Sequence, residues 1–83
     1  MGMSETVKVF VEFYAEMYER PDKHPVGYYE AMGFGEFIMK NAGQFTREFC
    51  VERGDLLTSD REVAAFGYTV MKVNGLIDGL VWQ

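Results

Sequence analysis

The sequence predicts an all-α protein, formed by three helices in one small domain that covers residues 1–83. Two observations predict this class. Apolar residues recur at steps of three and four over most of the chain, and helix-capping residues stand where those stretches begin and end. The expected architecture is a long antiparallel hairpin of two helices, residues 26–53 and 59–82, with a shorter N-terminal helix over residues 4–20.

The first helix is predicted over residues 4–20. Ser4 is a suitable N-cap, and Pro21 ends the helix because proline disfavours helical backbone at the residue before it. A strand is the alternative, since residues 7–13 also alternate like a strand. The apolar face of the helix would contain Met3, Val7, Phe10, Tyr14 and Met17.

A polar connector with two prolines, residues 21–25, separates this helix from the second one, predicted over residues 26–53. The apolar seam of the second helix alternates large side chains with Ala or Gly, which is typical of helices that approach closely. Gly54 is expected to end the helix, just past its last turn. The seam residues are Tyr28, Ala31, Gly35, Ile38, Ala42, Phe45 and Phe49.

The third helix is predicted over residues 59–82 and begins with a capping box, Ser59-Asp60-Arg61-Glu62. The dipeptide Asn74-Gly75 is a competing signal, because Asn-Gly between apolar runs favours a hairpin of two strands, residues 68–73 and 76–81. We prefer one helix, since the apolar seam continues across this dipeptide. The seam residues are Val63, Phe66, Val70, Val73, Ile77 and Leu80.

Association of the chain with itself is expected from the length of the hairpin. Its helices would measure about 42 and 35 Å, and the first helix, at about 25 Å, is too short to cover both flanks. Apolar side chains left uncovered, such as Phe34, Phe37 and Met39, favour an interface between copies. Glycines in helices admit a second backbone at close range. The contact is predicted at Gly67, Met71, Gly75, Gly79 and Trp82.

The chain offers few groups for catalysis or metal binding. It has one histidine, His24, and one cysteine, Cys50, so the paired spacings of metal sites are missing and no Cys–His or Ser–His pair can be proposed. Gly33-Phe34-Gly35 lacks the preceding strand of a phosphate-binding loop. We expect no metal, no cofactor and no enzymatic activity, with an enzyme that uses Glu and Tyr side chains as a third hypothesis.

Composition and charge exclude several classes of protein. With 48% hydrophobic residues, the chain has enough apolar surface to fold. A formal net charge of −5 argues against binding duplex nucleic acid through its phosphates. Because the chain has no 18-residue apolar run, no stretch like a signal peptide and a single cysteine, we expect a cytoplasmic protein without a membrane partner.

Two candidate binding surfaces follow from the charged and aromatic residues. Glutamates that share one face of the first helix predict a protein partner with a basic surface, and a solvated helix face is the alternative. This acidic surface consists of Glu12, Glu16, Glu19 and Tyr18. A cluster of cations and tyrosines at the connector predicts instead a small ligand such as a nucleotide, bound where subunits meet. This cluster consists of Lys23, His24, Tyr28 and Tyr29.

A very short, acidic, aromatic-rich chain of this kind resembles the small accessory proteins of bacteriophages. Those include inhibitors of host enzymes and counter-defence proteins, some of which block nucleases and some of which sequester signalling nucleotides. The resemblance lies in the composition of the whole chain and assigns no role to any residue. The sequence is therefore interpreted as a non-enzymatic, protein-binding inhibitor or adaptor acting as a homo-oligomer in the host cytoplasm, with a nucleotide-sequestering protein as the alternative.

Overall fold

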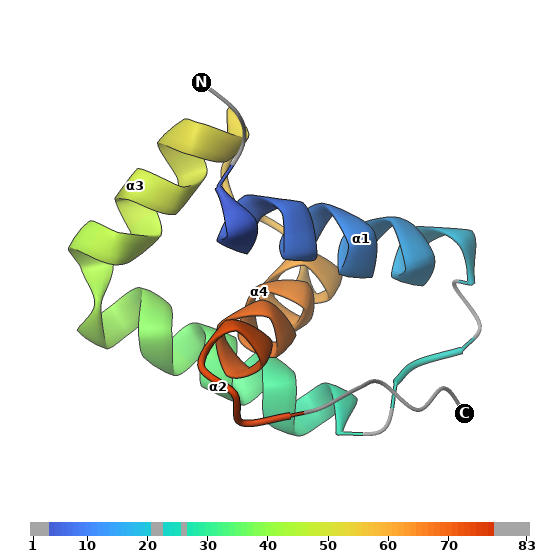
Figure 1. Cartoon of the computed structure of the whole chain (residues 1–83). Coiled ribbons are helices and arrows are strands. Elements are labelled where there is room, and N and C mark those ends of the chain that lie inside the picture. The colour runs from blue at the N-terminus through green and yellow to red at the C-terminus, as the bar shows by residue number, and fades with distance from the viewer. Residues whose placement is uncertain (1–3, 21–22, 26, 78–83) are drawn as a thin grey trace.

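The structure, a computed structural model, describes residues 4–20, 23–25 and 27–77, and these residues form four α-helices and no strand (Figure 1). The helices are α1 (Glu5–Glu19), α2 (Tyr28–Asn41), α3 (Gly43–Arg53) and α4 (Asp60–Val73). The predicted all-α class is confirmed, whereas the number of helices and the long hairpin are wrong. The body measures 33 × 27 × 25 Å, so it has no room for a straight helix of about 42 Å.

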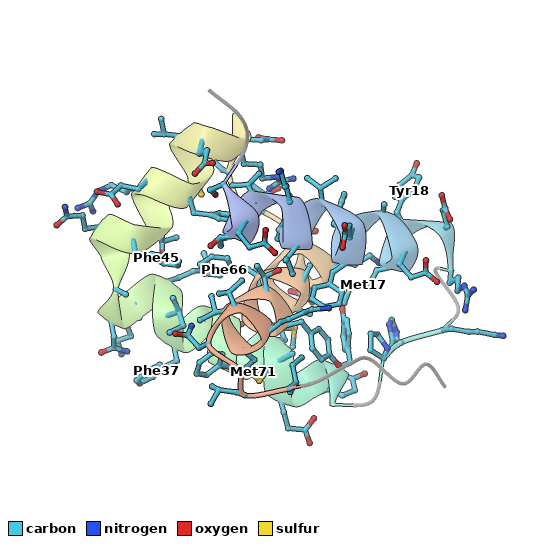
Figure 2. All side chains as sticks on the ribbon, in the orientation of Figure 1. Met17, Tyr18, Phe37, Phe45, Phe66 and Met71 are labelled. Carbon is cyan, nitrogen blue, oxygen red and sulfur yellow. The ribbon has the colours of Figure 1, made fainter. Side chains whose placement is uncertain are left out.

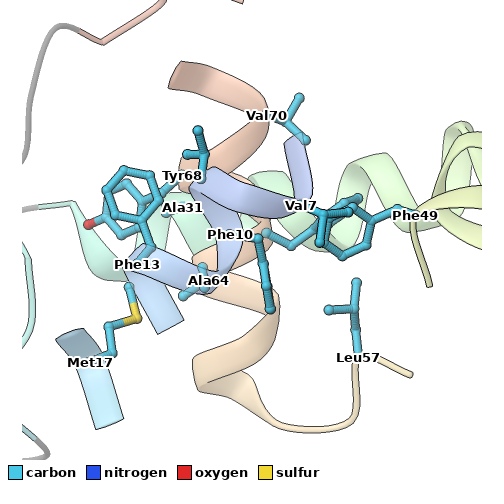
Figure 3. Packing of buried hydrophobic residues seen from close by; sticks show 13 residues of the cluster. Val7, Phe10, Phe13, Met17, Ala31, Phe49, Leu57, Ala64, Tyr68 and Val70 are labelled. Carbon is cyan, nitrogen blue, oxygen red and sulfur yellow. The ribbon is translucent and has the colours of Figure 1, made fainter. Parts of the chain in front are cut away.

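The first helix follows its prediction closely. The Ser4 hydroxyl accepts the backbone N–H of Val7 at 3.3 Å and caps α1, which ends at Glu19. The helix is confirmed over the strand alternative. Its predicted inner face is buried at Val7, Phe10 and Met17, where the side chains pack into the core (Figure 3).

The predicted second helix is broken at Ala42, whose backbone leaves the helical region at φ −125° and ψ 56°. Ala42 caps both neighbours, since its N–H donates to the carbonyl of Ile38 and its own carbonyl accepts the N–H of Thr46. Gly43, the next residue, costs a helix interior roughly 0.5–1 kcal/mol relative to alanine, so a break there is cheap. The apolar spacing continued through Ala42 and gave no sign of the break.

The break turns α3 so that Phe49 reaches the core. Its ring centroid lies 5.1 Å from that of Phe10 and 4.9 Å from that of Phe66. Phe45, which the unbroken seam placed inside, is instead 39% exposed, although its ring still stacks against Phe66 (Figure 2). Gly54, with φ +90°, ends α3 as predicted.

Helix α4 ends at Val73, so both predictions for Asn74-Gly75 are wrong: the helix does not continue through it, and residues 68–73 are not a strand. Gly75 has φ +72°, and the N–H groups of Gly75 and Leu76 donate to the carbonyls of Lys72 and Met71. This pair of bonds is the Schellman motif that closes a helix on a left-handed glycine.

Helix α4 is the centre of the molecule, between α1 on one side and α2 on the other, with α3 across one end (Figure 1). Every residue from 62 to 70 is buried. Small residues on α4, such as Ala64 and Ala65, allow its neighbours to lie close. The largest buried side chains of the core come mainly from α1 and α4, and they include Phe10, Met17 and Phe66.

The crossing of α2 and α4 depends on two glycines. A Cβ atom at Gly67 would overlap the carbonyl of Ala31, and one at Gly35 would overlap the carbonyl of Val63. The close backbone approach expected at Gly67 therefore exists, but it is made by α2 of the same chain. Gly67 is buried and is not available to a second copy, which corrects the predicted interface at this residue.

The other residues of that predicted interface have different positions. Met71 is half-buried against the core, and Gly75 has open space around it. Gly79 and Trp82 lie outside the described residues. A continuous glycine row on one helix face is therefore not formed, because α4 ends before Gly75.

Replacing Gly67 with alanine tests the crossing. We expect Gly67→Ala to lower the free energy of unfolding by at least about 1–3 kcal/mol, because the new methyl group must push the α2 backbone away. Gly33→Ala is the matched control, since nothing lies within 4 Å of a Cβ there and alanine should raise the free energy by about 0.5–1 kcal/mol. Denaturant unfolding followed by circular dichroism measures both. Equal stability of the two variants would contradict the crossing.

Candidate functional site

A pocket of about 400 Å³ lies where the C-terminal half of α1 meets the starts of α2 and α4. We call it the tyrosine pocket. It brings together part of the predicted acidic surface, Tyr18, with part of the predicted ligand cluster, Tyr28. Its lining residues are Tyr14, Tyr18, Tyr28, Ser59, Asp60 and Arg61.

Two of the three tyrosines come from α1 and continue an aromatic row that begins in the core. Phe10, Tyr14 and Tyr18 follow each other at four-residue steps, which places them on one side of the helix. The ring centroids of Phe10 and Tyr14 lie 5.8 Å apart, and those of Tyr14 and Tyr18 lie 6.4 Å apart. The row leads from a fully buried ring to Tyr18, which is 68% exposed and points away from the core (Figure 2).

The third tyrosine, Tyr28, is the first residue of α2 and is held by its neighbours. The His24 ring stacks on it with centroids 4.1 Å apart, and the Tyr29 ring is nearly perpendicular to it with centroids 5.3 Å apart. His24 is half-buried in this position. Three of the four residues of the predicted ligand cluster are thus in contact, whereas Lys23 is exposed in the connector.

The connector is attached to α4 by a buried hydrogen bond. The Tyr68 hydroxyl donates to the carbonyl of Pro25 at 3.2 Å. Burial, followed by the negative charge of Glu30, raises the pKa of Tyr68 to about 12, so the hydroxyl keeps the proton that it donates. Because Pro25 follows His24 directly, this bond fixes the chain beside Tyr28.

The start of α4 is positioned by its cap and by an ion pair. The Ser59 hydroxyl accepts the N–H of Glu62 at 3.2 Å, which confirms the predicted capping residue. The carboxylate of Glu62 accepts the hydroxyls of Ser59 and Thr58 and pairs with Arg53 at 2.7 Å. The side chains of this pair are only 8% and 13% exposed, so α3 and α4 are joined at this point by a pair of buried charges.

The Arg53 guanidinium also contacts the aromatic row. It lies 4.7 Å from the ring centroid of Phe10 and 5.7 Å from that of Tyr14. Such contacts with aromatic faces favour a cation that has lost part of its hydration. The same arginine therefore links α3, the start of α4 and the row on α1 that leads into the tyrosine pocket.

Charges of both signs border the pocket, since Asp60 and Arg61 are neighbours in its lining. Burial is the first cause that raises the pKa of the Tyr28 hydroxyl above its ordinary value, and the charge of Asp60 adds to it, while Arg61 acts in the opposite direction. The arrangement suits the binding of a flat or cationic group, through aromatic rings and one carboxylate.

The predicted acidic surface lies along α1. Glu12 and Glu19 are exposed, and Glu16 forms an ion pair with Arg20 at 3.0 Å. The structure therefore places Tyr18 in the pocket lining and leaves the three glutamates outside it. Sequence reasoning missed Tyr14, because it fits the core seam, and also Asp60 and Arg61, because their signal was a capping box.

Comparisons of the chain with protein-family models, curated proteins and solved structures gave no match. Within residues 4–20, 23–25 and 27–77, no group of three or more His, Cys, Asp or Glu side chains is placed to hold a metal ion. No helix in the same part of the chain is long and apolar enough to cross a membrane.

The ion pair predicts a response to acid. The pKa of Glu62 is shifted upward by burial, but the hydrogen bonds and charge of Arg53, with the Ser59 and Thr58 hydroxyls, outweigh this and hold it below 4.5. Ionised Glu62 thus contributes its full stability above about pH 4.5 and loses it as the pH falls through the lower folded value. We expect Glu62→Gln to lower the free energy of unfolding by roughly 1.5–3 kcal/mol at about pH 6.

Urea unfolding of both proteins between about pH 6 and pH 3 measures this effect. The difference between wild type and Glu62→Gln should shrink as the pH falls, because protonated Glu62 and glutamine are both neutral. Glu36→Gln, at an exposed position on α2, is the control and should change little at any pH. A difference that stays constant over the whole range would show that the charge of Glu62 is unimportant.

Proposed function

We propose that this protein is a non-enzymatic binding protein that attaches to another protein through α1. The binding face consists of Glu12, Glu16, Glu19 and Tyr18, together with the adjoining tyrosine pocket. The observation that carries the proposal is the position of Tyr18. It is 68% exposed on the same helix as the glutamates, and it belongs to the lining of the pocket.

Physical properties of these residues support a protein partner. Tyrosine combines a large apolar ring with a hydroxyl, and it is enriched at protein interfaces. A row of carboxylates attracts a basic surface and speeds its encounter with the protein, particularly in a chain of net charge −5. A protein that binds in this way acts by covering its partner, so we place it among inhibitors or adaptors of the phage accessory type, acting in the cytoplasm of the host cell.

A nucleotide ligand is the second candidate. Three residues of the tyrosine pocket favour a nucleotide, because Tyr18 and Tyr28 could stack on a base while Arg61 contacts a phosphate. Asp60 opposes it, since a carboxylate in the same lining repels phosphate oxygens. We therefore prefer a protein partner for this face.

Charge reversal on α1 tests the proposed function. Glu12→Lys combined with Glu16→Lys should abolish retention of the partner while the helical circular-dichroism signal is kept, because both side chains lie on the solvent side of α1. The measurement is quantitative affinity capture from the host cell at several salt concentrations, for wild type and variant in parallel.

The matched control is Glu36→Lys with Glu48→Lys, which makes the same change in net charge on α2 and α3. A partner released by the α1 variant and retained by the control supports the proposal. Retention by both variants, with the same salt dependence as wild type, contradicts it.

Self-association is part of the proposal, through a different surface. An apolar groove of about 740 Å³ runs along α3 and the loop after it, and Val51 and Leu56, 81% and 65% exposed, belong to its lining. The same lining contains two charges of opposite sign, Arg47 and Asp55. In a two-fold contact, apolar side chains of each copy would enter the groove of the other, and Arg47 of one copy would face Asp55 of the next.

Light scattering over a wide concentration range tests this association. Wild type should give a multiple of 9.5 kDa, and Val51→Glu should lower it to one subunit, because a carboxylate cannot be buried in the apolar contact without a partner. Val11→Glu, at an exposed position on α1, should leave the mass unchanged. A wild-type mass of one subunit at every concentration would contradict self-association.

A further inference from the structure

We propose that the tyrosine pocket receives one cationic side chain of the protein partner, an arginine, held against the tyrosine rings and paired with the Asp60 carboxylate. The inference rests on the proposed function, because it names the chemistry by which the partner would meet the α1 face. It is carried by a contact that the chain already makes with its own Arg53.

Arg53 shows how this scaffold holds a guanidinium. The group lies over two rings of the aromatic row on α1, 4.7 Å from the centroid of Phe10 and 5.7 Å from that of Tyr14. The same group pairs at 2.7 Å with Glu62, in the first turn of α4. An arginine is thus bound between aromatic rings of α1 and a carboxylate at the start of α4.

The tyrosine pocket repeats these components one turn farther along α1. Tyr18 follows Tyr14 as Tyr14 follows Phe10, and Asp60 stands in the same first turn of α4 as Glu62. Tyr28 adds a third ring, whose position is fixed by the stacked His24. The pocket therefore offers rings and a carboxylate from the same two helices that hold Arg53, but at the surface, where a side chain from outside can reach them.

The surrounding charges favour a cation. Glu16 and Glu19 lie on α1 next to Tyr18, and the whole chain carries a net charge of −5. Asp60 belongs to the pocket lining, and its charge, after burial, helps to raise the pKa of the Tyr28 hydroxyl, so this carboxylate lies close to that ring. Arg61, in the same lining, repels an incoming cation. Substitution of Asp60 or Arg61 therefore shows whether the pocket prefers a positively or a negatively charged ligand.

The test uses arginine blocked at both ends as the probe, with blocked citrulline as its neutral analogue of the same shape. Binding to the full chain is followed by the NMR signals of the Asp60 and Arg61 amides and the tyrosine rings. We expect blocked arginine to bind and citrulline to bind at least about tenfold more weakly. Asp60→Asn should weaken arginine binding about tenfold, and Arg61→Gln should strengthen it several-fold.

Two aromatic variants locate the probe. Tyr18→Ala should reduce the affinity, whereas Phe37→Ala, at a comparably exposed position on α2 outside the pocket lining, should leave it unchanged. All four substituted residues lie at the surface or in the first turn of a helix, and circular dichroism checks that each variant is folded. The same titrations with adenosine monophosphate examine an anionic ligand with a flat base.

Opposite signs would overturn the inference. If adenosine monophosphate binds, Arg61→Gln weakens it and blocked arginine gives no shifts at tens of millimolar, the pocket takes an anion. If blocked arginine binds but Asp60→Asn and Tyr18→Ala do not change its affinity, it binds elsewhere and the inference also fails. The charge reversal on α1 distinguishes this outcome from failure of the proposed function. If that variant releases the partner but arginine does not bind in the pocket, the proposed function is supported and only the inference is rejected.

Discussion

The fold depends on the contact between the backbones of α2 and α4. Gly35 and Gly67 carry no side chain at the crossing, so each backbone touches a carbonyl of the opposite helix. This approach brings two helices nearer than ordinary side chains allow, and it makes α4 the centre of the molecule. Around such a central helix even a polar residue must be satisfied locally, as Thr69 is by donating its hydroxyl to the carbonyl of Ala65 at 2.6 Å. Helices α1 and α3 then complete the core by covering what α2 leaves open (Figure 3).

The second constraint is the buried pair of Arg53 and Glu62. A buried ion pair gives little net stability, because the loss of hydration offsets most of the attraction, but a pair with one charge removed is strongly destabilising. Its effect is therefore on position: α3 can end only where Arg53 reaches both Glu62 and the ring of Phe10. Since Glu62 also accepts the hydroxyls of Thr58 and Ser59, the loop before α4 is drawn into the same network. This network holds the first turn of α4 against the aromatic row, and it thereby positions the residues of α1 and α4 that line the tyrosine pocket.

The two surfaces that we propose for binding lie at opposite ends of α1. Tyr18 stands near the C-terminal end of that helix, whereas α3, which provides part of the groove lining, lies across the other end (Figure 1). Association of copies through α3 would therefore leave the tyrosine pocket and the glutamates of α1 accessible. Two copies joined in this way would present two identical acidic faces, and such a pair binds a partner with two basic sites more tightly than a single copy does. For a chain of 83 residues with a thin core, association also adds buried apolar area.

The sequence by itself determined the features that depend on neighbouring residues. The helical class, the caps at Ser4 and Ser59 and the end of α3 at Gly54 all follow from local spacing and local hydrogen bonds, and all are found in the structure. Only the tertiary structure decided where the helices end within a continuous apolar pattern. The spacing of apolar residues shows which face of a helix is apolar, but it does not show how long the helix can be inside a small core. For this reason Ala42 and Asn74 were placed within helices, and Gly67 was assigned to a second copy although α2 already contacts it. The tyrosine pocket could not be predicted either, since its rings and charges come from three helices that meet only after α2 and α4 have crossed.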